Sequence, residues 1–252
     1  MLNKGVDTIM KICVVVLLAL IMLVGSCKKS PEEGASEQTA SENTGAETAK
    51  TQDSDMVALG IKLPKPMFVG TPQNIRVPRL EKPLGRPRPP FLAPKGTENV
   101  ALGKPVLSSD QEPIIGEIEM ITDGDKEGAD GSYVEFAPFL QHVTIDLEDE
   151  FDIYAITLWH FHKQGRVYSD VVVQIADDPD FITNVRTLFN NDLDNSSGLG
   201  IGQDMHYVET HEGRLIDAKG NRARYVRLYS NGNSSNELNH YIEVEVYGKP
   251  AK

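Results

Sequence analysis

The chain is poor in cysteine, with only Cys13 and Cys27 among its 252 residues. Two cysteines leave no room for the disulfide framework that stabilises many small secreted domains. Tryptophan occurs once, and the longest uninterrupted apolar run, from residue 12 to residue 24, is short. A membrane-spanning helix needs about 20 apolar residues, so this run matches the core of a secretion signal better than a transmembrane segment.

Common catalytic signatures are also missing. The chain contains no G-x-S-x-G nucleophile elbow, no H-E-x-x-H zinc motif and no phosphate-binding P-loop. From residue 98 onward, 28 Asp and Glu residues stand against 12 Lys and Arg residues, a difference of −16. Such acidity repels phosphate backbones and disfavours a nucleic-acid partner, whereas divalent cations and neutral ligands remain compatible with it. We therefore expect a binding protein and not an enzyme.

The N-terminus carries an export and anchoring signal. Lys11 precedes the apolar run, which ends in Val24-Gly25-Ser26-Cys27. This ending resembles a bacterial lipobox, in which small residues lead into a cysteine that is lipidated and becomes the mature N-terminus. The resemblance implies that residues 1–27 are a lipoprotein signal peptide, that Cys27 is the lipid attachment site, and that the protein is anchored to a membrane of the bacterial cell envelope. Lysines instead of aspartate after Cys27 favour the outer membrane or cell surface.

Two segments of unusual composition follow. Residues 28–61 are mostly small and polar, too poor in apolar surface to offset the entropy of ordering, and are predicted to form a disordered tether. Residues 62–97 are rich in proline and in Lys and Arg, which predicts a basic, extended arm. The PxxP spacing within residues 86–90 suits either a peptide ligand or a semi-rigid spacer. Apolar residues interleaved along the arm, such as Phe68 and Phe91, predict that it lies along the acidic domain.

Residues 98–250 show alternation typical of β-strands. Apolar residues at every second position predict strands at 141–147, 171–175, 223–229 and 241–247, with Val143, Ile145 and Leu147 on one face of the first. Turn residues separate these strands, and no segment has a clear helical period. The pattern predicts an all-β domain with a β-sandwich or jelly-roll fold.

Five pieces of this domain resemble the coagulation factor 5/8 type C, or discoidin, domain. They occur in the family's order at 99–106, 121–125, 141–147, 223–228 and 242–248. The resemblance implies a galactose-binding-like jelly-roll β-sandwich whose first and last strands pair. It also implies a non-catalytic module, most often carbohydrate-binding in bacterial envelope proteins.

The same resemblance implies a structural Ca²⁺ ion where an Asp-Gly loop meets the last strand. Calcium takes six to eight oxygen ligands from carboxylates, hydroxyls and carbonyls. The chain departs from the family pattern because residues 126–133 form a longer loop, with Ser132-Tyr133 where the family has Thr-Trp. The alternative is an acidic turn without metal. The implied calcium ligands are Thr122, Asp123, Asp125, Ser132, Ile242 and Glu243.

A rim for a sugar ligand is predicted between two strands, at 159–168. Sugar recognition needs an aromatic or apolar face and planar polar groups for hydroxyls. Trp159 suits either this role or a place in the core. Arg166 can either bind a ligand or form a structural ion pair with Asp170. The spacing of His160 and His162 also allows a transition metal, although no third ligand is fixed by spacing. The predicted ligand-binding residues are Trp159, His160, His162, Arg166 and Tyr168.

A second polar loop, at 190–196, has Asp-x-Asp spacing but lacks the glycine and terminal glutamate of an EF-hand. We expect a surface loop that borders the ligand site. The sequence thus favours a lipid-anchored carbohydrate-binding module with a structural calcium ion. The alternative is an envelope lipoprotein that binds a partner protein and no sugar.

Overall fold

A computed structural model describes residues 55–68, 70, 72 and 74–252 of the chain. The predicted signal peptide with Cys27, and most of the predicted tether, lie outside these residues. Among the described residues, no helix has the length and apolarity needed to cross a bilayer. The elements in chain order are β1 (Met56–Ala58), β2 (Leu92–Pro94), β3 (Glu98–Asn99), β4 (Val106–Ser108), the 3₁₀ helix η1 (Ile118–Thr122), β5 (Val134–Phe136), β6 (Gln141–Trp159), β7 (Val172–Ala176), β8 (Arg186–Asn190), β9 (Arg214–Ser230), β10 (Asn239–Tyr241) and β11 (Glu243–Pro250).

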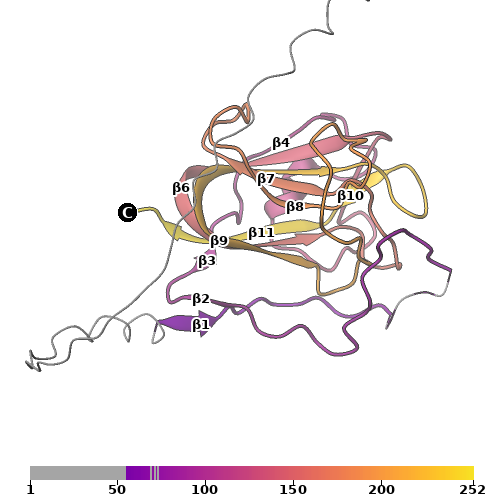
Figure 1. Ribbon diagram of the computed structural model, residues 1–252, viewed down its shortest axis with the longest axis horizontal. Coiled ribbons are helices and arrows are strands. Elements are labelled where there is room, and N and C mark those ends of the chain that lie inside the picture. The colour runs from indigo at the N-terminus through magenta and orange to yellow at the C-terminus, as the bar shows by residue number, and fades with distance from the viewer. Residues whose placement is uncertain (1–54, 69, 71, 73) are drawn as a thin grey trace, which may run out of the picture. The chain divides into compact units, whose positions relative to one another are not determined.

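Two long bent strands, β6 and β9, build the domain. They pair with each other along most of their length in a sheet of order β3-β11-β6-β9-β7-β8, in which β4 also pairs with β6. The register of β6 against β9 shifts between Asp146 and Phe151, where Glu148 has a positive φ of 67°. Such irregularities bend a strand sharply. Each strand therefore contributes its two halves to two different layers, and the bends lie at the end nearest the C-terminus (Figure 1).

The two layers share one core. Val143 and Ile145 from the first half of β6 belong to the same buried cluster as Ile156 and Leu158 from its second half. Hydrophobic side chains from both layers thus close a β-sandwich. The strand β3 pairs with β11, with Tyr247 opposite Asn99, so the first and last strands of the domain lie side by side as expected. The predicted all-β jelly-roll β-sandwich is confirmed.

The inward faces of the strands follow the alternation in the sequence. Val143, Ile145 and Leu147 have no exposed surface, and Val244 and Val246 of β11 are equally buried. The outward face of β11 differs from a simple alternating strand, because Glu243 and Glu245 are buried as well. Both faces of this strand are covered, since other segments lie over the outer face of its layer.

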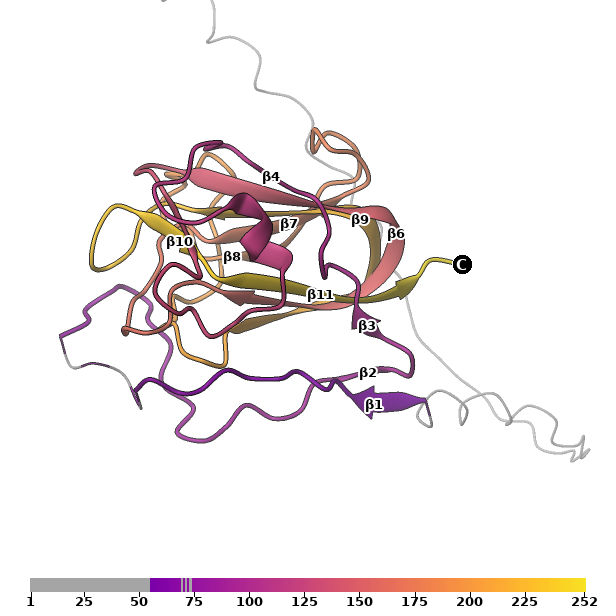
Figure 2. The ribbon, with the colours of Figure 1, turned by 180° about the vertical axis from the view of Figure 1, so that it is seen from behind.

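The proline-rich segment is one of the coverings. Its strand β2 pairs with β1, which forms at the end of the segment predicted as a disordered tether, and the chain between β1 and β2 runs beside the sandwich in both views (Figures 1 and 2). Glu81 N–H donates to the His206 carbonyl at 2.8 Å, and His206 N–H donates to the Arg79 carbonyl at 3.0 Å. Further along, the guanidinium of Arg88 donates to the Gly213 carbonyl at 3.0 Å. The arm thus lies along the domain and is attached to the segment that precedes β9 and to the start of β9.

Candidate functional site

The predicted sugar-binding rim at 159–168 is almost wholly buried. Trp159, His160, His162 and Tyr168 are each at most 2% exposed. The indole N–H of Trp159 donates to the His211 carbonyl at 3.0 Å, which satisfies the ring's only polar atom. A sugar ring cannot stack on a covered side chain, so these four residues do not form a binding surface in this conformation.

His160 belongs to a buried polar pair. Its Nδ1 lies 2.6 Å from a carboxylate oxygen of Glu209, and both side chains are at most 1% exposed. The imidazole also stacks on Tyr168 with ring centroids 4.2 Å apart. A buried charge is tolerated only when it is paired and hydrogen-bonded. The pair therefore serves the fold, and removal of one partner would leave the other buried alone.

A second buried network surrounds His240. Its Nδ1 lies 3.0 Å from the Tyr168 hydroxyl, and its Nε2 lies 3.0 Å from a carboxylate oxygen of Glu135. Burial, with the nearby Arg166 guanidinium, lowers the pKa of His240 to about 3. The imidazole is therefore neutral, and its contact with Glu135 is a hydrogen bond and not an ion pair. Arg166 lies 3.3 Å from Nε2 of the same ring, so the predicted ligand-binding arginine is engaged by the fold.

The arm helps to cover this region. A side chain at Gly165 would overlap Pro72, and Phe68 of the arm lies against the same place. The two histidines considered for a transition metal have different hydrogen-bond partners. His160 pairs with Glu209, whereas His162 Nε2 lies 2.8 Å from the Lys126 carbonyl. Among the described residues, neither histidine belongs to a cluster of three metal-ligating side chains.

Glu243 is the centre of the predicted calcium site. Its carboxylate is fully buried, and Gly124 N–H of the Asp-Gly loop donates to Oε2 at 3.1 Å. Within the part of the chain that the structure describes, Oε1 has no hydrogen-bond partner. Burial, together with the nearby carboxylates of Glu245 and Asp123, raises the pKa of Glu243 to about 9. A buried carboxylate oxygen without a donor fits a cation, which would replace the proton.

The loop side of the predicted calcium site is less complete. Asp123 is exposed and near Glu243, and its Oδ1 accepts Asp125 N–H at 2.7 Å. Asp125 instead accepts Glu127 N–H at 2.9 Å. The hydroxyl of Thr122 donates to the Lys104 carbonyl at 3.0 Å, and the Thr122 carbonyl oxygen, the expected ligand, already accepts Gly103 N–H at 2.7 Å. Ser132 lies in the longer loop and Ile242 precedes Glu243, so the calcium set as a whole stays a prediction.

An exposed aromatic ring stands elsewhere, beside a polar hollow. Phe139, in the loop between β5 and β6, is 80% exposed and has a φ of 74°. A bulky residue in this left-handed region is held by its surroundings, because the conformation is unfavourable for it. The hollow has a volume of about 210 Å³. Phe139 lines it together with Ser169, Asn231, Gly232, Asn233, Asn236 and Glu237.

A buried asparagine joins the two loops of this hollow. The Asn239 amide N–H₂ donates to the carbonyls of Ala137 and Phe139 at 3.0 and 2.9 Å. Its side-chain oxygen accepts Gly232 N–H at 2.8 Å and the Ser230 hydroxyl at 2.9 Å. One side chain thus fixes the loop that carries the aromatic ring against the loop that carries the amides, at the end of the sandwich opposite the C-terminus (Figure 1).

The loop at 190–196 meets the same end of the domain. The Ser196 hydroxyl donates to Oδ2 of Asp170 at 2.9 Å, and the Asn231 amide donates to the same oxygen at 2.8 Å. Asp170, Asp192 and Asp194 place carboxylate oxygens within 4.8 Å of one another. Serine hydroxyls and backbone N–H groups already satisfy much of this cluster, so it is a loop anchor that borders the hollow.

Sequence reasoning missed Phe139 and the asparagines. The available signal was the polar stretch 231–236, in which Asn231-Gly232 indicates a turn. No local pattern tells that Phe139 faces solvent, because its exposure follows from a backbone conformation and from a hydrogen bond to Asn239, a residue distant in sequence.

No protein-family model and no curated protein matches the sequence. Several solved structures have a similar backbone fold. The CBM32 of AlyQ, in complex with 4,5-unsaturated mannuronic acid, is 17% identical with a TM-score of 0.42, over 56% of this chain and 92% of that chain. The Streptococcus pneumoniae fucose binding module SpX-3 is 19% identical with a TM-score of 0.42, over 60% and 97%.

A family 89 glycoside hydrolase from Clostridium perfringens is 19% identical with a TM-score of 0.44, over 61% of this chain. The match covers only 15% of that enzyme. Similarity at this level assigns neither a ligand nor an activity to this chain.

Proposed function

We propose that this protein is a non-catalytic carbohydrate-binding module that lipid on Cys27 anchors to the bacterial cell envelope. The observation that carries the proposal is the exposed Phe139 ring beside an amide-lined hollow. Sugars present apolar C–H faces that stack on aromatic rings, and their hydroxyls pair with planar amides. Phe139 supplies the first element, and the side-chain oxygen of Asn231 and the amide N–H₂ of Asn236 supply the second. The Asn233 amide is bonded within its own loop and holds that loop in shape.

The size and charge of the hollow limit the sugar. Its volume of about 210 Å³ is below the roughly 300–1,000 Å³ of pockets for drug-sized ligands, so it suits one terminal sugar unit. Glu237 is the charged residue of the lining, which contains no lysine or arginine. A carboxylate-bearing sugar would find no cation there, so we expect a neutral or an amino sugar.

Calcium is the proposed structural ion. Glu243 fits it best because its Oε1 is buried without a donor, and Asp123 lies close enough to affect its pKa. Thr122, Asp125, Ser132 and Ile242 complete the proposed set. Bound at this place, the ion would join the Asp-Gly loop to β11 and remove the cost of the buried carboxylate.

Anchoring at the outer membrane or cell surface completes the proposal. It rests on the lipobox-like residues that end in Cys27 and on the lysines that follow. Incorporation of a radiolabelled fatty acid tests the anchor, and a Cys27→Ser variant must lose the label. A labelled Cys27→Ser chain would contradict the assignment of the attachment site.

A glycan array tests the sugar ligand. The full chain should bind one group of neutral or amino-sugar glycans, and Phe139→Ala should abolish this signal. Ile182→Ala is the matched control, because Ile182 is also 80% exposed but lies away from the hollow. Ser169 of the lining precedes β7, whereas Ile182 follows the other end of this strand. Absence of glycan binding by the folded chain, with a single envelope protein recovered by cross-linking, would favour the interaction-protein alternative instead.

A further inference from the structure

The proline-rich arm carries a concentration of positive charge on an otherwise acidic protein. Taken together with β1, the arm spans residues 56–97 and contains eight Lys and Arg residues and one acid, Glu81, a difference of +7. The rest of the domain, from residue 98, has the difference of −16 given above. Opposite charges on one folded unit would ordinarily be expected to pair with each other.

The arm's cations do not pair with the domain. Glu81 is held by Arg214 at 2.9 Å, so the arm's one acid is used by a cation of the sandwich. Among the described residues, no lysine or arginine of the arm forms an ion pair. Arg79 and Arg88 donate to the backbone carbonyls of Gln203 and Gly213. The remaining six cations are exposed or nearly so: Lys62, Lys65, Arg76, Lys82, Arg86 and Lys95.

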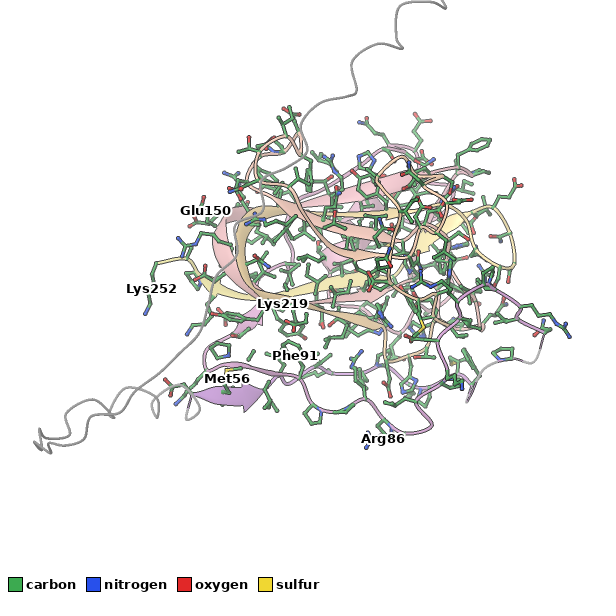
Figure 3. All side chains as sticks on the ribbon, in the orientation of Figure 1. Met56, Arg86, Phe91, Glu150, Lys219 and Lys252 are labelled. Atoms are coloured by element: carbon green, nitrogen blue, oxygen red, sulfur yellow. The ribbon has the colours of Figure 1, made fainter. Side chains whose placement is uncertain are left out.

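These cations are displayed on a fixed backbone. The bridge between Leu80 and His206 and the Arg88 contact with Gly213 attach the arm to the sandwich at two separate places, and the β1–β2 pairing joins the two ends of the arm to each other. Figure 3 shows Arg86 on the outer edge of the arm, pointing away from the sandwich. Proline in turn restricts the backbone between the attachments. The six exposed cations therefore form a row of positive charge along the arm, and Arg86 of this row points away from the acidic domain.

We propose that this row binds the anionic headgroups of a lipid bilayer. The inference rests on the proposed membrane anchor at Cys27, from which 28 residues lead to Met56. At roughly 3.5 Å per residue, the arm stays within about 100 Å of the attached lipid. Basic residues near an anionic surface and lipid chains act together, because one acyl chain alone gives only reversible binding.

Charge complementarity decides the partner. A neutral sugar gains nothing from the six exposed cations, and an anionic polymer wrapped around the arm would also meet the acidic sandwich, which repels it. A planar anionic surface can contact the row while the acidic domain faces away from it. In this orientation the bilayer lies on the arm side, and the Phe139 hollow remains at an end of the sandwich that the lipid does not cover.

The test is a lysine footprint on the full chain reconstituted into vesicles. A water-soluble acetylating reagent modifies exposed amines, and mass spectrometry measures the rate at each lysine. Vesicles of phosphatidylglycerol and phosphatidylethanolamine are compared with vesicles of phosphatidylcholine. Lys62, Lys65 and Lys82 report on the arm, and the exposed Lys219 and Lys252, both marked in Figure 3, are internal controls.

We expect several-fold slower acetylation of the three arm lysines on the phosphatidylglycerol vesicles only, with Lys219 and Lys252 unchanged. The protection should disappear at about 1 M salt, where the screening length falls to about 3 Å. Equal rates on both kinds of vesicle would overturn the proposal. Protection by added soluble polyphosphate but not by vesicles would overturn it too.

If Cys27 carries no lipid, the experiment gives a result different from the one expected if the arm does not bind lipid. A chain without lipid on Cys27 would leave phosphatidylcholine vesicles during flotation, whether or not the arm binds. Salt-sensitive protection of the arm on phosphatidylglycerol vesicles would then still support the lipid-binding row, while the anchor at Cys27 would be refuted. A triple variant, Lys62→Gln, Lys65→Gln and Lys82→Gln, should weaken association with these vesicles by about fivefold per charge.

Discussion

Two loop regions of this domain use similar kinds of residue in opposite ways. The connection at 159–168 brings a tryptophan, histidines, an arginine and a tyrosine together, and its aromatic and imidazole rings are largely buried. The hollow beside Phe139 has one aromatic ring and several amides, and the ring is 80% exposed. Residue type alone therefore does not distinguish a binding surface from a buried polar network. The residues form a buried network where another segment of the chain covers them, and a binding surface where none does.

The two regions also differ in what their hydrogen bonds accomplish. In the covered connection, polar side chains bond to other buried side chains, as His160 does in its hydrogen bond with Glu209. At the hollow, the buried Asn239 holds the backbone carbonyls and leaves the amides of the lining partly exposed. The first arrangement stabilises the fold, and the second positions groups that a ligand can reach.

The comparison predicts its largest effect at the buried pair. His160→Ala or Glu209→Ala should lower the free energy of unfolding by about 3–5 kcal/mol, because each change leaves an unpaired buried group. Urea denaturation measures the loss. Replacing both residues by Phe and Leu should cost less than either single change. A loss below about 1 kcal/mol for both single variants would show that the pair is not needed for the fold.

Glu243 should give a pH-dependent effect of a few kcal/mol. Its folded pKa of about 9 lies above the ordinary value of about 4.3, so the folded chain keeps a proton that the unfolded chain releases. This contribution to stability is complete below pH 4 and is lost as the pH rises toward 9, at up to about 1.4 kcal/mol per pH unit.

The check compares melting of the wild type and Glu243→Gln in EDTA from pH 5 to pH 8.5. Gln mimics the protonated acid, so the variant should become the more stable chain as the pH rises. Calcium should reverse this order, because only the wild type retains the carboxylate. Parallel pH curves in EDTA would contradict the raised pKa, and no shift with Ca²⁺ would contradict the proposed ion.

Asn239→Ala should sharpen the contrast between the two regions. The change removes four hydrogen bonds and leaves buried donors and acceptors without a partner, for an expected loss of about 2–3 kcal/mol. Glycan affinity should fall as well, although Asn239 is fully buried and touches no ligand. Thermal melting and titration of the same preparation separate the two effects. Unchanged affinity would show that the loops of the hollow need no clamp.

The smallest effect is expected from the arm. Glu81→Ala breaks the partly exposed pair with Arg214 and should cost about 1 kcal/mol or less. Local detachment should still be visible as faster proteolytic cleavage between residues 76 and 88. Lys82→Ala, next to it and without an ion pair in the described residues, is the matched control. Equal cleavage of the two variants would mean that this ion pair does not hold the arm.

The sequence was sufficient for the fold because alternation is a local property. Val143, Ile145 and Leu147 could be assigned to the core from their spacing, and the structure confirms it. Pairing of the first and last strands followed from the family resemblance. The bends at Glu148 and near Lys219, which let β6 and β9 serve two layers, have no comparable signal in the apolar pattern.

The candidate site was harder to predict because burial there depends on distant segments. Trp159 is the last residue of β6, and its lack of exposure reflects Gly213 and other residues brought over it by the fold. Gly165 meets Pro72 and Phe68 of the arm, which precede it by many residues. An aromatic ring and histidines in a polar loop look the same in sequence whether such a covering exists or not.

Calorimetric titration with the glycan found on the array tests the central claim most directly. Phe139→Ala should weaken binding by about tenfold or more, while changing the free energy of unfolding by less than about 0.5 kcal/mol. Arg166→Ala, in the covered connection, should retain the affinity of the wild type as long as the chain stays folded. Normal affinity of Phe139→Ala together with lost affinity of Arg166→Ala would contradict the account and return the ligand to the connection at 159–168.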